Sequence, residues 1–154
     1  MKRKQLLHLL LVCAAVFCCA VTPAGAAQVP SENIIRLENM RYDLIEPSAI
    51  TQDTDEASPL TTGSLNTTVP PFYSKAVGQI SLQSGNVITF NCSYSPSSAS
   101  VDFGVIAPNG RFYYINIKEG SIKQSIEVSQ SGSYTVAIRN NSSQTVRVVG
   151  FVNY

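Results

Sequence analysis

Residues 101–117 have the sequence VDFGVIAPNGRFYYINI. Two runs of β-branched and aromatic residues flank Pro108-Asn109-Gly110, a cluster that is typical of turns. Asn and Gly both tolerate the positive φ angles of a tight type I′ turn, so the stretch predicts an antiparallel β-hairpin. The same alternation of short apolar runs and turn residues continues on both sides of it.

Seven short strands follow from this pattern in the second half of the chain, and no helical period competes with them. Their inward positions alternate with polar positions, as Tyr134, Val136 and Ile138 do. The sequence therefore predicts an all-β fold, a small antiparallel β-sandwich over residues 76–154, with a jelly roll as one arrangement. The predicted strands are Ala76–Leu82, Val87–Tyr94, Val101–Ala107, Arg111–Ile117, Ile122–Val128, Ser133–Asn140 and Gln144–Tyr154.

The first segment has the pattern of a secretory signal peptide. Residues 2–4 are basic, residues 6–21 form an apolar run, and small residues follow at 23–27. We expect residues 1–26 to be cleaved, with a cut after Ala27 as the alternative. A lipoprotein anchor fits poorly, because the residues before the three cysteines of this run are not small. The mature protein is then secreted, without stable membrane insertion.

Cleavage changes the charge and the reactive groups of the chain. It removes three of the 11 Lys and Arg residues and none of the 10 Asp and Glu residues, which leaves a net charge of −2. A weakly acidic chain has no electrostatic reason to bind nucleic acid. Cys92 is then the only cysteine, and its apolar strand pattern predicts a buried thiol rather than a reactive one.

The composition argues against most catalytic chemistry. His8, the single histidine, lies in the predicted signal peptide, so a His-based nucleophile system or a typical zinc site is not expected. The carboxylates of the predicted sandwich are too sparse for the facing pair of a glycosidase. An acidic grouping at Asp53, Asp55 and Glu56 is better interpreted as a solvated spacer than as a calcium site. No catalytic residue, cofactor or metal is therefore predicted.

Residues 27–75 differ from the rest and are predicted to be an acidic segment of low order. Thr51–Pro71 is rich in Thr, Ser, Asp and Pro, and it predicts a disordered linker. Upstream, Glu32–Ile45 fits either a short amphipathic helix or short extended pieces. In the helical case, the apolar outer face of the last strand, at Val149 and Phe151, is a candidate surface for it. Residues 76–154 are expected to fold on their own.

The aromatic run Phe112-Tyr113-Tyr114 is the one candidate ligand site. In a strand, Phe112 and Tyr114 face one way and Tyr113 the other. One interpretation is that one side belongs to the core and Tyr113 is a surface ring. The other is a stacking platform for a sugar or peptide, built from Tyr113 and its neighbours.

Ser131-Gly132-Ser133-Tyr134 is a recurrent phrase of β-sandwiches, in which the Tyr packs at a corner and its hydroxyl bonds to backbone. Together with the final strands, residues 85–154 resemble bacterial pre-peptidase C-terminal-like domains. The whole chain is similar to small exported proteins of Firmicutes that carry one such sandwich. The resemblance implies a β-sandwich on an exported protein and supplies no catalytic residue.

The sequence thus predicts a non-catalytic exported protein that acts as an extracellular interaction or structural module. Its expected partner is a protein or a glycan at the cell surface. The alternative is a small glycan- or peptide-binding module that uses surface tyrosines.

Overall fold

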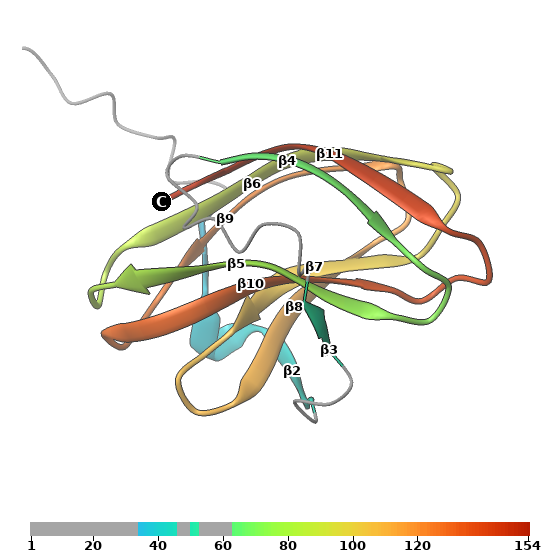
Figure 1. The fold of residues 1–154 in the computed structure, drawn as a ribbon. Helices are drawn as coiled ribbons and strands as arrows, with labels where there is room; N and C mark the ends of the chain where they lie inside the picture. Colours follow the sequence, from blue (N-terminus) through green and yellow to red (C-terminus); the bar gives the residue numbers. More distant parts are fainter. Residues whose placement is uncertain (1–33, 46–49, 53–62) are drawn as a thin grey trace, which may run out of the picture.

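The computed structural model describes residues 34–45, 50–52 and 63–154. They form two sheets packed face to face, which confirms the predicted all-β sandwich (Figure 1). In the upper layer of that view the strand order is β1-β9-β6-β11-β4, and in the lower layer it is β2-β8-β7-β10-β5-β3. The predicted signal peptide lies outside the described residues. Within those residues no helix is long and apolar enough to cross a membrane.

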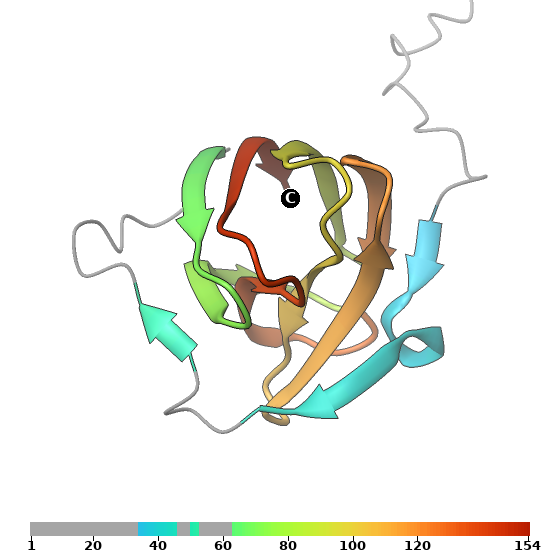
Figure 2. The same cartoon turned by 90° about the vertical axis from the view of Figure 1, so that its right-hand side faces the viewer.

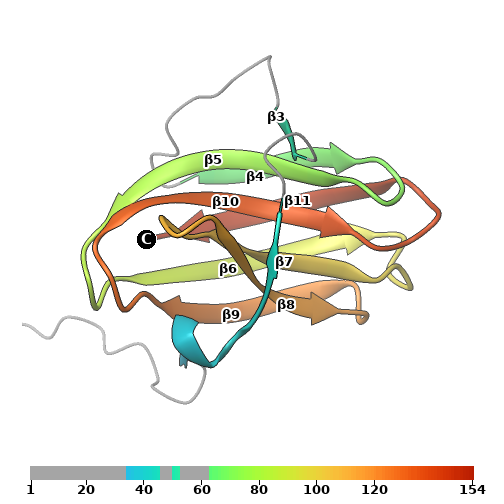
Figure 3. The same cartoon turned by 90° about the horizontal axis from the view of Figure 1, so that it is seen from below.

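All seven predicted strands are present, with ends that differ by at most two residues from the prediction. They are β5 (Ser74–Leu82), β6 (Val87–Ser95), β7 (Val101–Ile106), β8 (Arg111–Ile117), β9 (Ser121–Glu127), β10 (Gly132–Asn140) and β11 (Val146–Asn153). Neighbours among these seven pair antiparallel. In Figure 3 they run alongside one another along the length of the molecule.

The upstream segment also forms strands. These are β1 (Ile34–Arg36), β2 (Arg41–Leu44), β3 (Ile50–Gln52) and β4 (Gly63–Val69), with a 3₁₀ turn, η2 (Leu37–Asn39), between β1 and β2. Since β1 pairs with β9 and β2 pairs with β8, the segment passes from one sheet to the other (Figure 2).

Two predictions for this upstream region are therefore corrected. The linker predicted over Thr51–Pro71 is wrong where β3 and β4 form, and its residues 53–62 lie outside the described part. Of the two alternatives for Glu32–Ile45, short extended pieces form at Ile34–Arg36 and Arg41–Leu44, and docking on the last strand is wrong. Leu37 and Met40 are instead buried in the common core. The independent folding of residues 76–154 stays a prediction.

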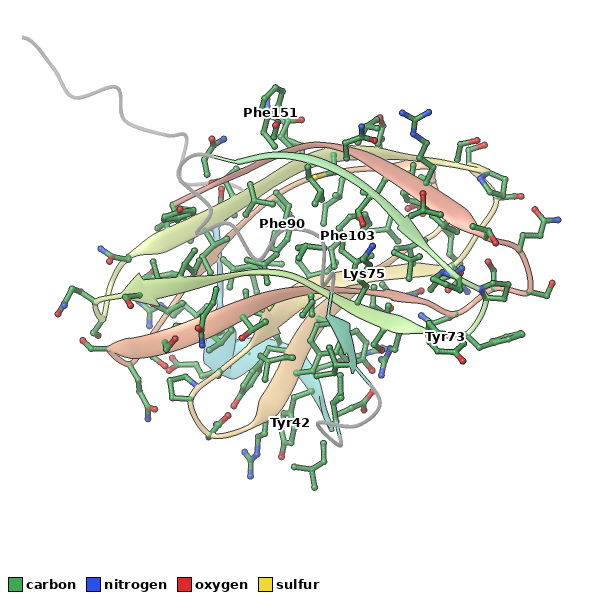
Figure 4. The ribbon with its side chains drawn as sticks, viewed as in Figure 1. Tyr42, Tyr73, Lys75, Phe90, Phe103 and Phe151 are labelled. Atoms are coloured by element: carbon green, nitrogen blue, oxygen red, sulfur yellow. The ribbon has the colours of Figure 1, made fainter. Side chains whose placement is uncertain are left out.

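The core fills the space between the layers with aliphatic side chains and a few rings. Phe90 of the upper sheet meets Phe103 of the lower sheet with ring centroids 6.1 Å apart (Figure 4). Cys92 is buried here, as predicted. Tyr134 is fully buried and its hydroxyl donates to the Gln130 carbonyl at 2.8 Å, which confirms the predicted corner.

The hairpin at residues 107–111 forms with a different turn from the one predicted. Gly110 N–H donates to the Ala107 carbonyl, and Ala107 N–H to that of Arg111. Gly110 has a φ of +77°, whereas Asn109 does not have a positive φ. This is a three-residue connection with glycine in the left-handed region rather than a type I′ turn.

Candidate binding surfaces

Tyr113 is a core residue. Only 8% of it is exposed, it lies 5.5 Å from the ring of Tyr42 in β2, and its hydroxyl accepts a hydrogen bond from the Asn109 amide at 3.1 Å. The interpretation of Tyr113 as a surface ring is wrong, because β2 adds a strand beside β8 and closes over this side.

Phe112 and Tyr114 lie on the outer face of the six-stranded sheet. Their rings stack, with centroids 5.5 Å apart. The Arg139 guanidinium lies over both rings, 4.6 Å from the centroid of Tyr114 and 5.3 Å from that of Phe112. Phe112 is fully buried as a result, and Tyr114 is half-buried. The three aromatic residues therefore do not form an open platform. Ligand binding by them stays a prediction that depends on Tyr114.

Arg139 belongs to a hydrogen-bonded network on the same face. Asp102 is 1% exposed and accepts bonds from Arg139 Nε at 2.7 Å, Asn116 at 2.6 Å and Asn141 at 2.8 Å. Asp43 forms an ion pair with the same guanidinium, and its Oδ2 lies 2.7 Å from Arg139 Nη1. Burial lowers the pKa of Arg139, but its hydrogen bonds and charge interactions with Asp43 and Asp102 outweigh this and raise it. The network ties β2, β7, β8 and β10 together, and both carboxylate oxygens of Asp102 accept hydrogen bonds in it.

Cys92 is held as a thiol. Burial raises its pKa, against the opposing effect of backbone hydrogen bonds with Phe151 and Asn91. A thiol with a raised pKa is a poor nucleophile. Among the described residues no group of three or more His, Cys, Asp or Glu side chains is placed to hold a metal ion. The acidic grouping at residues 53–56 lies outside them.

The β4–β5 turn presents two aromatic rings to solvent. Phe72 is 71% exposed and Tyr73 is 51% exposed. Figure 4 shows Tyr73 at one end of the sandwich, pointing away from it. Phe72 has a φ of +59°, the one positive φ among the described non-glycine residues. A bulky residue in the left-handed region is uncommon and costs free energy.

One buried side chain holds this turn. Asn140 is fully buried, and its amide nitrogen donates to the carbonyls of Val69 at 3.1 Å and Pro70 at 3.0 Å. Its backbone N–H donates to the Tyr73 carbonyl at 2.9 Å. The bonds lie on both sides of Phe72, so they fix the turn where it enters and where it leaves. Sequence reasoning missed this surface because it placed Pro70-Pro71 at the end of a linker.

Comparison with known proteins adds little to this geometry. No family model matches the sequence, and no curated protein matches it. Among solved structures, the chain is similar to PliG of Aeromonas hydrophila, a periplasmic inhibitor of g-type lysozyme. The identity is 12% and the TM-score is 0.40, over 68% of this chain and 96% of that one. So distant a similarity implies nothing about this chain's partner. The resemblance to pre-peptidase C-terminal-like domains stays a prediction.

Proposed function

We propose that this chain is an exported, non-catalytic module that binds a protein partner through the β4–β5 turn. The observation that carries the proposal is Phe72, which is exposed and nevertheless held at a positive φ. The fold gains little from burying this ring, and a glycine would occupy the same backbone conformation without strain. Strain that is held in place at an exposed ring is characteristic of a binding site.

The chemistry around the turn suits a protein partner. Large aromatic side chains on a fixed backbone lose little entropy on binding, and they dominate the energetics of protein interfaces. Phe72 offers no hydrogen bond, so it suits an apolar pocket. The loop beside it, residues 141–145, is mostly exposed and consists of Asn, Ser, Gln and Thr. Rings among small polar residues are also the chemistry of antibody binding loops.

Quantitative affinity capture from the producing cell's surface fraction tests the proposal. The mature protein is compared with Phe72→Ser/Tyr73→Ser and with a control, Tyr42→Ser, which removes a half-exposed ring elsewhere. We expect a specific protein to be captured by the wild type and by the control, and to be lost with the turn variant. Equal capture by all three refutes a role for the turn, provided that their melting temperatures agree.

A further inference from the structure

The outer face of the five-stranded sheet carries a second surface, independent of the β4–β5 turn. The strand register places Phe151 of β11 beside Asn91, and Val149 beside Ser93. On the other side of β6, Asn91 pairs with Lys123 of β9. The outward positions beside Val149 and Phe151 are thus polar, and these two side chains form an apolar ridge on β11. The ring of Phe151 stands away from the sheet in Figure 4.

Two open hollows on this face form one groove. The first, of about 490 Å³, is lined by Asn91, Ser93, Ser121, Lys123, Val149 and Phe151, above backbone of the strands. The second, of about 350 Å³, is lined by Ser93, Ser95, Arg147 and Val149 together with Tyr94. Both hollows are lined by Ser93 and Val149, so they adjoin. Lys123 and Phe151 line one end of the groove, on either side of β6, and Arg147 lines the other end.

The groove has a cation at each end and no carboxylate in its lining. Lys123 and Arg147 are exposed, and neither pairs with an acidic residue of the described chain. Arg147 makes only long contacts with the Asn66 side chain, at 3.3 and 3.4 Å. Phe151 is 54% exposed and lies across Asn91 from Lys123. Phe151, Val149 and Arg147 therefore lie along β11, and the polar side chains of β6 lie between this row and Lys123 of β9.

We propose that this groove binds a linear acidic polysaccharide. Carboxylates of the chain pair with Lys123 and Arg147, a sugar face lies on Phe151, and sugar hydroxyls bond to the serine and asparagine floor. A second copy of this protein fits less well, because facing grooves bring like charges together. An amphipathic helix fits less well too, because the ridge offers only Val149 and Phe151 as exposed apolar side chains.

Titration of the mature protein with polygalacturonate tests the proposal. The variant is Lys123→Gln/Arg147→Gln. The matched control is Arg41→Gln/Lys118→Gln, which removes the same charge from exposed positions outside the groove. We expect wild type and control to bind alike and the groove variant to bind about tenfold more weakly, since it loses two exposed ion pairs and each contributes only modestly. Binding should also weaken as salt is raised.

A second variant separates sugar recognition from simple polyanion binding. Phe151→Ser should weaken the binding of polygalacturonate and leave the weaker binding of polyglutamate unchanged, since polyglutamate has no sugar ring. The proposal is overturned if wild type does not bind polygalacturonate, or if groove and control variants bind it equally. It is also overturned if polyglutamate binds as tightly as polygalacturonate, or if the protein is a dimer whose interface includes Phe151. None of these results bears on the β4–β5 turn, because no groove residue belongs to it.

Discussion

Replacing Phe72 by glycine should stabilise the protein relative to replacing it by alanine. Both substitutions remove the same exposed ring, so the loss of side-chain contacts cancels in the comparison. Only alanine retains a Cβ atom, and the φ of +59° brings a Cβ into conflict with the backbone. The comparison therefore isolates the strain that the turn holds.

The size of the effect follows from two opposing terms. A non-glycine residue in the left-handed region costs about 1–2 kcal/mol. Glycine loses more backbone freedom on folding, which costs about 0.5–1 kcal/mol relative to alanine. We therefore expect Phe72→Gly to be more stable than Phe72→Ala by about 0.5–1 kcal/mol. At Tyr73, which does not have a positive φ, only the second term applies, and glycine should be less stable than alanine by a similar amount.

Urea unfolding of the four variants measures this directly, with the slope of the transition checked for constancy. The decisive result is the change of sign between neighbouring positions, because errors common to all four variants cancel. If glycine is the less stable residue at both positions, the turn holds no strain at Phe72. The argument for a binding site at that residue then fails.

Three further predictions concern the sandwich itself. Asp102→Ala should cost about 3 kcal/mol, because it removes the buried acceptor of Arg139 Nε, Asn116 and Asn141. Asp43→Ala should cost less than about 1 kcal/mol, because that carboxylate is 44% exposed; chemical denaturation distinguishes the two. Gly150→Ala should lower the free energy of unfolding by about 2 kcal/mol or more, because Gly150 has a φ of +150° and a Cβ there would overlap the Asn91 carbonyl. A melting temperature within about 1 °C of wild type would contradict this. Burial raises the pKa of Cys92 above its unfolded value, so the contribution of this thiol to stability is constant below about pH 8.5 and falls as the pH rises beyond it. In Cys92→Ala that part of the decline should disappear.

The seven strands could be predicted from sequence because their signal is local. In β10, for example, Tyr134, Val136 and Ile138 recur at every second position, and turn residues stand at both ends. Alternation over a few residues suffices to place a strand and to say which side chains share a face. The turn type at Asn109-Gly110 was less predictable, because the same two residues suit more than one kind of hairpin.

The strand β4 was missed because its apolar content is low. Leu65, Thr67 and Val69 are its buried residues, and one of the three is a threonine. Averaged over Thr51–Pro71, this alternation is hidden among polar residues, so the stretch has the composition of a linker. β4 forms because it pairs with β11, a strand that lies about 80 residues later in the chain. The composition of residues 51–71 does not indicate such a long-range pairing.

The candidate surfaces depend on contacts still more distant in the sequence. The alternation correctly separated Tyr113 from Phe112 and Tyr114, but it did not say which side would be closed, because β2 and Arg139 close the two sides from elsewhere in the chain. The β4–β5 turn is fixed by Asn140, whose amide reaches a carbonyl 71 residues away. Exposure of a ring is therefore a property of the whole fold. Residue type alone selected three aromatic residues of which the fold buries Phe112 and Tyr113 and half-buries Tyr114, whereas Phe72 and Phe151, the most exposed rings of the described residues, come from a turn and an outer strand face.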